Sequence, residues 1–520
     1  MDSEPLLDVP VASLVTRPRR CACGPASLTP AVLLYVVLAG LASILFGYEN
    51  SVVASGVNDY MGALASKDSG NQGLLKGALA LGATVACPFA GFLQDGLGRR
   101  ITLIICCVVY LGVCAVTATA PAYPSGFPQM AAGRFLTGMV VGVFSSTVPM
   151  YIAELSPPAI RGALVTVNQV CICAGILLGY LSSYLLSPSW RFEFAAATPL
   201  AAVLVASFAL ITPFSPRWLM TKGREGEARA ILMRLRRGET AAVEEELRQM
   251  REAADAAREA SAGGASKYAA LAQPHIRWAV AIGVTGAVMQ QWVGVNAVNG
   301  FAPNIFKSTG STDAQAHLQT VYIGVAKLVF VVVALALMDR AGRRPLLLVG
   351  CAGMALSSAL LAASYQMKDA NTLAVVALVL YMAFFEISLG PILWLLLSEL
   401  YPASVKGVAM SIGSTVAWYV SCGKRCAATA AAAIGRRSRT PPPSLSHPHV
   451  DRLMTYAVNQ TYLPMSQGLG NAGAFYFYAA VCVASFLWIY VFIFETKGRT
   501  LEDIQLLLKG EKVEGNATEK

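Results

Sequence analysis

The sequence predicts an all-α membrane protein with twelve transmembrane helices in two homologous six-helix bundles. Composition, a succession of apolar runs and an internal repeat lead to that fold class. Hydrophobic residues make up 55% of the 520 residues and charged residues only 13%, about half of the roughly 25% found in soluble domains. The mean hydropathy is +0.55. No soluble fold hides that much apolar surface, so we expect the lipid bilayer to surround much of the chain.

Apolar runs follow one another along the chain in the order six, a polar break, then six. They lie at 31–57, 77–94, 101–120, 130–153, 163–186, 192–212, 278–306, 320–338, 345–366, 373–397, 407–421 and 473–494. This order predicts a tail at 1–30, a bundle at 31–212, a linker at 213–276, a second bundle at 277–494 and a tail at 495–520. The linker is rich in Ala, Glu and Arg, which favours solvated helices that connect the bundles over a separate functional domain.

Basic residues in the short loops predict the orientation. On one side these residues are Arg99, Arg100, Arg161, Arg340, Arg343, Arg344 and Lys406. By the positive-inside rule that side is cytoplasmic, together with both tails and the linker. This distribution also accounts for the net charge of +10, so we expect no nucleic-acid partner.

The cysteines and histidines indicate neither catalysis nor a metal. Eight of the twelve cysteines lie inside apolar runs, where thiols behave as small hydrophobes. Cys422 and Cys426, with His447 and His449, have a spacing that fits no standard zinc site. The sequence also contains no nucleophile–base pair or nucleotide-binding loop. We therefore expect no enzyme activity, no cofactor and no metal.

The two halves repeat each other at a constant offset. The motif Asp-x-x-Gly-Arg-Arg at 95–100 recurs at 339–344, and 339 − 95 = 244. Glu154 recurs as Glu399, and 399 − 154 = 245. Because two unrelated motifs share one offset, the halves are predicted to be homologous and to have the same orientation. That is the arrangement of a major facilitator fold.

Seven short motifs occur in order along these halves. They are Gly91-x3-Asp95-x2-Gly98-Arg99-Arg100, Gly133-Arg134, Glu154-Leu155-Ser156-Pro157, Pro216-Arg217-Trp218-Leu219, Gln290-Gln291-x2-Gly294-x-Asn296, Gly390-Pro391-x2-Trp394 and Glu495-Thr496-Lys497-Gly498-x-Thr500-Leu501-Glu502. Together they resemble the sugar porter family of the major facilitator superfamily, over roughly residues 38–504. The resemblance implies transport of a monosaccharide (hexose, pentose or polyol), coupled to proton symport by alternating access.

The resemblance also implies a sugar-binding set on the fifth, seventh, tenth and eleventh spans. Its members are Gln169, Gln290, Gln291, Asn296, Trp394 and Trp418. Amide side chains both donate and accept, which suits the hydroxyl groups of a sugar, and Trp offers an apolar face and one N–H. The alternative for an amide within a membrane is a hydrogen bond between helices.

Two charged residues within spans, Glu49 and Arg134, are implied to couple sugar transport to the proton. Charges inside a membrane are expensive and usually functional. Glu49 lies where proton-coupled relatives resemble one another in having an aspartate. A carboxylate that gains and loses an arginine partner gains and loses a proton as well. The alternative is a static Glu49–Arg134 ion pair.

Charged residues of the repeated loops resemble a cytoplasmic gate that latches the transporter. The set consists of Asp95, Arg99, Glu154, Arg161, Asp339, Arg343, Glu399 and Lys406. The same residues also serve membrane topology and helix capping, and that reading remains open beside the gate.

The sequence departs from the family pattern at several positions. Phe214 replaces an acidic residue of the latch, and Gly300-Phe301 stands where a tyrosine pair usually closes the outer gate. Lys327 and Ala417 stand where amides are common, which leaves the identity of the sugar open. From the sequence, Lys327 can pair with Glu49 or extend toward the membrane surface.

Three functions remain open at this point. The favoured one is a proton-coupled monosaccharide symporter, with a sugar and a proton as its partners. The others are a facilitative uniporter, in which Glu49 is structural, and a sugar sensor that does not transport. We expect a monomeric, multi-pass protein of the plasma membrane, with a vacuolar or other endomembrane location as the alternative.

A segment within the eleventh span is foreign to a membrane helix. Residues 422–452 carry six Lys and Arg side chains and three consecutive prolines, and one central Arg or Lys costs about 2.5–3.5 kcal/mol on insertion. Joining residue 421 to 453 restores a run long enough to span. We favour a gene-model artefact over a genuine insertion. Sequencing the mature transcript tests this: the coding sequence for 422–452 should be missing. A transcript that keeps it, and whose product transports normally, would contradict the prediction.

Overall fold

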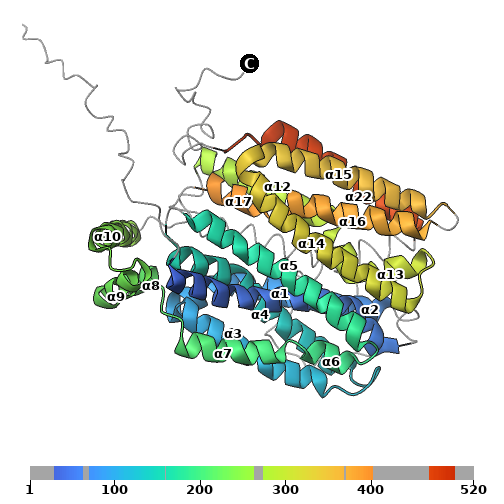
Figure 1. The fold of residues 1–520 in the computed structure, drawn as a ribbon, viewed down its shortest axis with the longest axis horizontal. Helices are drawn as coiled ribbons and strands as arrows, with labels where there is room; N and C mark the ends of the chain where they lie inside the picture. Colours follow the sequence, from blue (N-terminus) through green and yellow to red (C-terminus); the bar gives the residue numbers. More distant parts are fainter. Residues whose placement is uncertain are drawn as a thin grey trace, which may run out of the picture.

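The computed structural model describes residues 29–62, 69–157, 160–262, 273–367, 370–401 and 468–497. The regular secondary structure of these residues is entirely helical. Within them, eleven helical stretches are long and apolar enough to cross a membrane. The predicted eleventh span (407–421) and the segment 422–452 lie outside the described residues. Figure 1 shows two bundles side by side, the first in blue to green and the second in yellow to red.

The first bundle contains α1 to α7. Their bounds are α1 (Pro30–Met61), α2 (Ser69–Leu97), α3 (Arg99–Ala118), α4 (Phe127–Leu155), α5 (Arg161–Leu186), α6 (Trp190–Ala195) and α7 (Thr198–Leu210). Helix α1 begins where Thr29 accepts a hydrogen bond from the Val32 amide at 3.2 Å, with Pro30 in the first turn. Both features stabilise a helix start. Helices α6 and α7 together make the sixth span.

The second bundle contains α12 to α17 and α22. Their bounds are α12 (Pro274–Trp292), α13 (Val295–Ser308), α14 (Asp313–Ala341), α15 (Arg343–Ser364), α16 (Asn371–Ile387), α17 (Ile392–Leu400) and α22 (Gly470–Phe492). The seventh span is interrupted at Gly294, whose φ of +99° suits glycine and few other residues. The tenth span is interrupted between α16 and α17, at residues 388–391.

Three linker helices lie at one end of the bundles (Figure 1): α8 (Pro216–Thr221), α9 (Glu225–Leu235) and α10 (Thr240–Ala262). We call this the linker end, and the opposite end, where α1 ends and α2 begins, the far end. The linker is attached to the first bundle: Arg236 donates to the Leu155 carbonyl at 3.2 Å and pairs with Glu246 at 3.0 Å. The prediction of a helical linker is confirmed.

Glycines allow the closest helix crossings of the first bundle. A Cβ atom on Gly47 of α1 would overlap the Ile172 carbonyl of α5, and one on Gly175 of α5 would overlap the Ile44 carbonyl of α1. Helices α2 and α4 cross in the same way at Gly138. Small residues at membrane helix contacts let the backbones approach and gain dispersion energy. Large apolar side chains such as Leu210, 84% exposed, lie on outer faces, as lipid-facing surfaces require.

The repeat seen in the sequence is also present in three dimensions. Arg100 at the start of α3 donates to the Phe208 carbonyl at 2.8 Å, and Arg344 at the start of α15 donates to the Tyr490 carbonyl at 2.7 Å. The donors are 344 − 100 = 244 residues apart, whereas the acceptors are 490 − 208 = 282 apart. The two bundles are therefore built alike, and the second holds 38 additional residues between its donor and its acceptor.

Candidate functional site

The structure brings Glu49 of α1 and Arg134 of α4 together deep inside the first bundle. Their side chains are 3% and 1% exposed, and Arg134 Nη1 forms an ion pair with Glu49 Oε2. Arg134 Nη2 donates to the Glu49 carbonyl at 3.0 Å. The guanidinium therefore holds both the side chain and the backbone of Glu49. Arginine is suited to this double contact because its donors form a rigid fork.

Two aromatic residues complete the surroundings of this pair. Tyr110 of α3 donates its hydroxyl to Glu49 Oε1 at 2.5 Å, and the Arg134 guanidinium lies over the Phe194 ring at 5.3 Å. Each carboxylate oxygen of Glu49 thus has its own donor. Tyr110 was not predicted from the sequence; its signal was a tyrosine in the middle of an apolar run.

The predicted sugar-binding amides cluster around the two interruptions of the second bundle. Gln290 is 4% exposed and donates to the Leu389 carbonyl at 2.6 Å, at the break between α16 and α17. Gln291 accepts a hydrogen bond from Asn296 at 2.6 Å across the break of the seventh span. Trp394, on α17 just after the other break, is half-buried. The interruptions of the seventh and tenth spans therefore contact each other through Gln290.

The remaining members of the predicted sugar-binding set are separated by the structure. Gln169 lies on α5 in the first bundle, and its amide approaches the Cys173 thiol at 4.0 Å. Trp418 lies outside the described residues. The amide set is thus distributed over both bundles, as a site between them requires.

A second buried ion pair lies in the second bundle. Lys327 of α14 meets Glu386 of α16 at 2.6 Å, with side chains 2% and 1% exposed. Both alternatives predicted for Lys327 from the sequence are therefore wrong: its ammonium does not pair with Glu49, and it does not extend toward the membrane surface. The carboxylate of Glu386 neutralises the ammonium of Lys327. The Cys173 thiol of α5 lies next to this pair. Glu386 was not predicted from the sequence, although a lone acidic residue in an apolar run is a signal.

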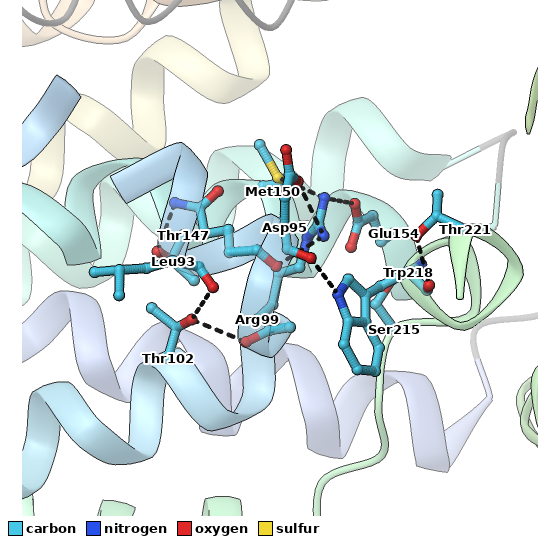
Figure 2. Close-up of polar contacts among 12 residues, drawn as sticks. Leu93, Asp95, Arg99, Thr102, Thr147, Met150, Glu154, Ser215, Trp218 and Thr221 are labelled. Atoms are coloured by element: carbon cyan, nitrogen blue, oxygen red, sulfur yellow. Dashed lines mark hydrogen bonds and ion pairs between the residues drawn. The ribbon is translucent and has the colours of Figure 1, made fainter. Parts of the chain in front are cut away.

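At the linker end, Arg99 connects two of the predicted gate residues (Figure 2). Its guanidinium lies 3.0 Å from Glu154 of α4 and 3.7 Å from Asp95 of α2. The Trp218 indole donates to the Asp95 carbonyl at 3.1 Å, which attaches α8 to the same corner. Gly98 adopts φ of +83°, and a Cβ atom there would press on the Trp218 ring. Glycine therefore permits both the turn and the approach of the linker.

The other predicted gate residues have different surroundings. Arg161 donates to the Ala153 carbonyl at 3.0 Å, one residue before Glu154. In the second bundle, the backbone amides of Arg343 and Arg344 donate to the two carboxylate oxygens of Glu495, at 3.0 Å each. Glu495 thus caps the start of α15, where a negative charge is favourable. The side chains of Asp339 and Glu399, and all of Lys406, lie outside the described residues.

In the first bundle, the position equivalent to Glu495 is occupied by Phe214, which carries no charge. Its ring stacks on Trp218, with centroids 5.5 Å apart, and the Arg100 guanidinium lies 4.9 Å from its centroid. Cation–π contact and stacking contribute attraction here in place of an ion pair.

The paired bundles, the interrupted helices and the buried charges together define a multi-pass membrane transporter of the major facilitator fold. Comparison with known proteins specifies it further. The family model "Sugar (and other) transporter" matches residues 35–437 and 449–508. The chain belongs to that family. Its match omits 438–448, which lies inside the segment expected to be foreign.

Three relatives show the range of this family. The chain is 29% identical to the D-xylose-proton symporter of Escherichia coli (strain K12), over 91% of this chain and 95% of that protein. It is 31% identical to Polyol transporter 5 of Arabidopsis thaliana, over 91% and 85%. It is 29% identical to the glucose facilitated diffusion protein of Zymomonas mobilis, over 92% and 97%.

Solved structures agree with the fold. The xylose transporter XylE from E. coli, in a partially occluded inward-open conformation, has a TM-score of 0.72 and 26% identity, over 91% of this chain and 100% of that one. XylE bound to 6-bromo-6-deoxy-D-glucose has a TM-score of 0.73 and 26% identity, over 93% and 100%. The prediction of a major facilitator fold is confirmed.

The Lys327–Glu386 pair generates a prediction about stability. Replacing one partner, as in Glu386→Gln, leaves a buried unpaired charge and should cost about 3–5 kcal/mol. The double variant Lys327→Met/Glu386→Met should cost much less, because no charge remains to be desolvated. Thermal unfolding of purified protein in detergent measures both. Lys307→Met, which breaks the exposed pair with Asp313, is the matched control and should change little. A double variant as unstable as the sum of both single variants would contradict the prediction.

Proposed function

We propose that this protein is a proton-coupled monosaccharide symporter of the plasma membrane that works by alternating access. The observation that carries the proposal is the intramembrane pair of Glu49 and Arg134. Similarity to the D-xylose-proton symporter supports the substrate class and the coupling ion. The chain acts as a transporter and not as an enzyme, as a monomer in the lipid bilayer, and takes a hexose, a pentose or a polyol.

The coupling step follows from the geometry around Glu49. In the structure its carboxylate accepts from Arg134 and from Tyr110. A proton that binds Glu49 Oε2 removes the negative charge that Arg134 faces, so the attraction between α1 and α4 falls. When the proton leaves, the ion pair forms again. Proton occupancy thereby changes the contact between two helices of the first bundle and can be linked to its movement.

The sugar would bind between the bundles. Gln290, Gln291 and Asn296 offer amides near the breaks of the seventh and tenth spans, and Gln169 offers one from α5 of the other bundle. Amides match a ring of hydroxyl groups because each amide both donates and accepts. The basic loops place the linker end in the cytoplasm. The bundles are joined at the far end by the bonds from Asn58 to Asn304 and from Lys76 to the Gly300 carbonyl, so that end is the closed one.

The Glu49 contacts generate a prediction about coupling. Glu49→Gln keeps the shape of the side chain but removes its exchangeable charge, so accumulation of labelled sugar driven by external acid should be abolished. Exchange of sugar across the membrane without a gradient should persist. Uptake into cells or vesicles, with and without a pH gradient, measures the first effect, and counterflow in the same vesicles measures the second.

Glu245→Gln is the control, because it makes the same chemical change on the exposed face of α10. It should accumulate sugar like the parent. If Glu49→Gln still concentrates sugar in response to acid, Glu49 is not the coupling residue. If the parent itself equilibrates sugar but never concentrates it, the protein is a uniporter.

The position of Gln290 generates a prediction about sugar affinity. Gln290→Ala removes an amide from the site and also frees the Leu389 carbonyl. We expect the apparent KM for sugar to rise by the equivalent of about 1–3 kcal/mol, with normal expression. Thr320→Ala is a suitable comparison, because its hydroxyl only bonds back to Ala316 within α14. An unchanged KM for Gln290→Ala would place the sugar elsewhere.

A further inference from the structure

Hydrogen bonds join the two bundles at the far end. Ser55 of α1 contacts His317 of α14 at 3.2 Å between the hydroxyl and Nδ1. Asn58, one turn further along α1, donates to Asn304 of α13 at 2.7 Å. These bonds must break when the site opens toward the far end, because their partners belong to different bundles.

Helix α13 presents backbone carbonyls to the first bundle. Pro303 has no N–H, so the Asn299 carbonyl lacks the donor that would come from position 303. Tyr180 of α5 donates its hydroxyl to that carbonyl at 3.1 Å. The next carbonyl, that of Gly300, accepts from Lys76 Nζ of α2 at 2.9 Å. Two successive carbonyls of one bundle thus receive donors from the other.

Lys76 is the charged member of this set. The residue is 7% exposed, and its ammonium also donates to the Ala54 carbonyl of α1 at 3.2 Å. The ammonium lies 4.3 Å from the centroid of the Phe301 ring. In the part of the chain that the structure describes, its partners are neutral. A buried ammonium is costly unless such groups replace its water, and two charge-assisted hydrogen bonds with a cation–π contact do so.

We propose that Lys76 is the positioning residue that holds the far end of the transporter closed. Gly300 and Phe301 move with the second bundle, whereas Lys76 and Ala54 move with the first, so the closed arrangement alone gives the ammonium all three partners. The inference rests on the proposed alternating-access cycle. Helix α1 then takes part both in proton coupling and in closure of the far end, because Glu49 lies five residues before Ala54 on the same helix.

A thiol-accessibility experiment tests the proposal. Ser55→Cys places a thiol at a position that is 1% exposed in the closed arrangement, and a membrane-impermeant maleimide applied from the far side reports its opening. Every variant carries this change, so its effect on the contact with His317 is common to all of them. In this background Lys76→Met keeps the length of the side chain but loses its charge and donors. We expect the labelling rate to rise about tenfold, which corresponds to about 1.4 kcal/mol. The same chain without the added cysteine gives the background from its native thiols.

Lys307→Met is the charge control: it removes one positive charge from the same end, breaks the exposed pair with Asp313 and relieves the repulsion that Lys307 exerts on Lys76. It should label no faster than the parent. Lys76→Gln, which keeps a neutral donor, should fall between the parent and Lys76→Met, and it replaces Lys76→Met if that variant does not reach the membrane. Labelling of the Lys76 variants that is unchanged or slower than the parent would overturn the proposal.

The labelling needs neither a sugar nor a proton gradient, whereas the uptake assay needs both. The labelling result can therefore contradict the role of Lys76 while proton-coupled uptake is retained. Conversely, uptake can lack proton coupling while Lys76 still controls accessibility at the far end. The two proposals are distinguishable by their failures.

Discussion

A charge enclosed by apolar helices must find its partner among the helices themselves, and much of this structure follows from that constraint. Lipid cannot replace the lost water, so polar or charged groups of the protein must do so. Glu49 and Arg134 meet between α1 and α4, and Lys327 and Glu386 meet between α14 and α16. Each pair lies within one bundle. The bundles can therefore move relative to each other without pulling a buried cation away from its anion.

The interrupted helices meet the same constraint for backbone groups. Where the seventh span breaks, Tyr381 donates to the Val293 carbonyl at 2.7 Å, and where the tenth breaks, Gln290 donates to the Leu389 carbonyl at 2.6 Å. Pro303 leaves a third carbonyl, that of Asn299, without its helical donor, and Tyr180 of the other bundle donates to it. Irregular backbone is tolerated in a membrane only when side chains satisfy it in this way. The breaks thus bring polar side chains together within the membrane, which is what the proposed sugar site requires.

Patterns in the sequence were sufficient for the parts of the fold that depend on composition and period. Apolar runs predicted the spans, and one offset shared by two motifs predicted the repeat that the Arg100 and Arg344 contacts display. The apolar run of the second span starts near 77, whereas the helix extends further toward the N-terminus. The helix begins at Ser69 and buries Lys76 against carbonyls of α1 and α13, partners that no local pattern reveals.

Partner choice across distant helices was the part of the site that the sequence could not specify. Glu49 and Arg134 were named together because a family pattern links them. Lys327 had no such guide, and its partner Glu386 lies two spans later in the chain. Which side chains face each other depends on the rotation and crossing of whole helices, and close contacts such as those at Gly47 and Gly175 set these.

The two bundles differ in how the described chain after their last span is attached. In the second bundle Glu495 caps the start of α15 with its carboxylate. In the first, Phe214 stands at that position, stacked on Trp218, and Trp218 in turn bonds to the Asp95 carbonyl. Arg236 adds a further bond from α9 to the end of α4. The capping carboxylate also accepts from the Lys497 amide, and the Lys497 ammonium donates to the Arg340 carbonyl, whereas the aromatic stack fastens the helix α8 that carries Trp218. The linker therefore belongs mechanically to the first bundle, and we expect it to move with that bundle when the transporter changes state.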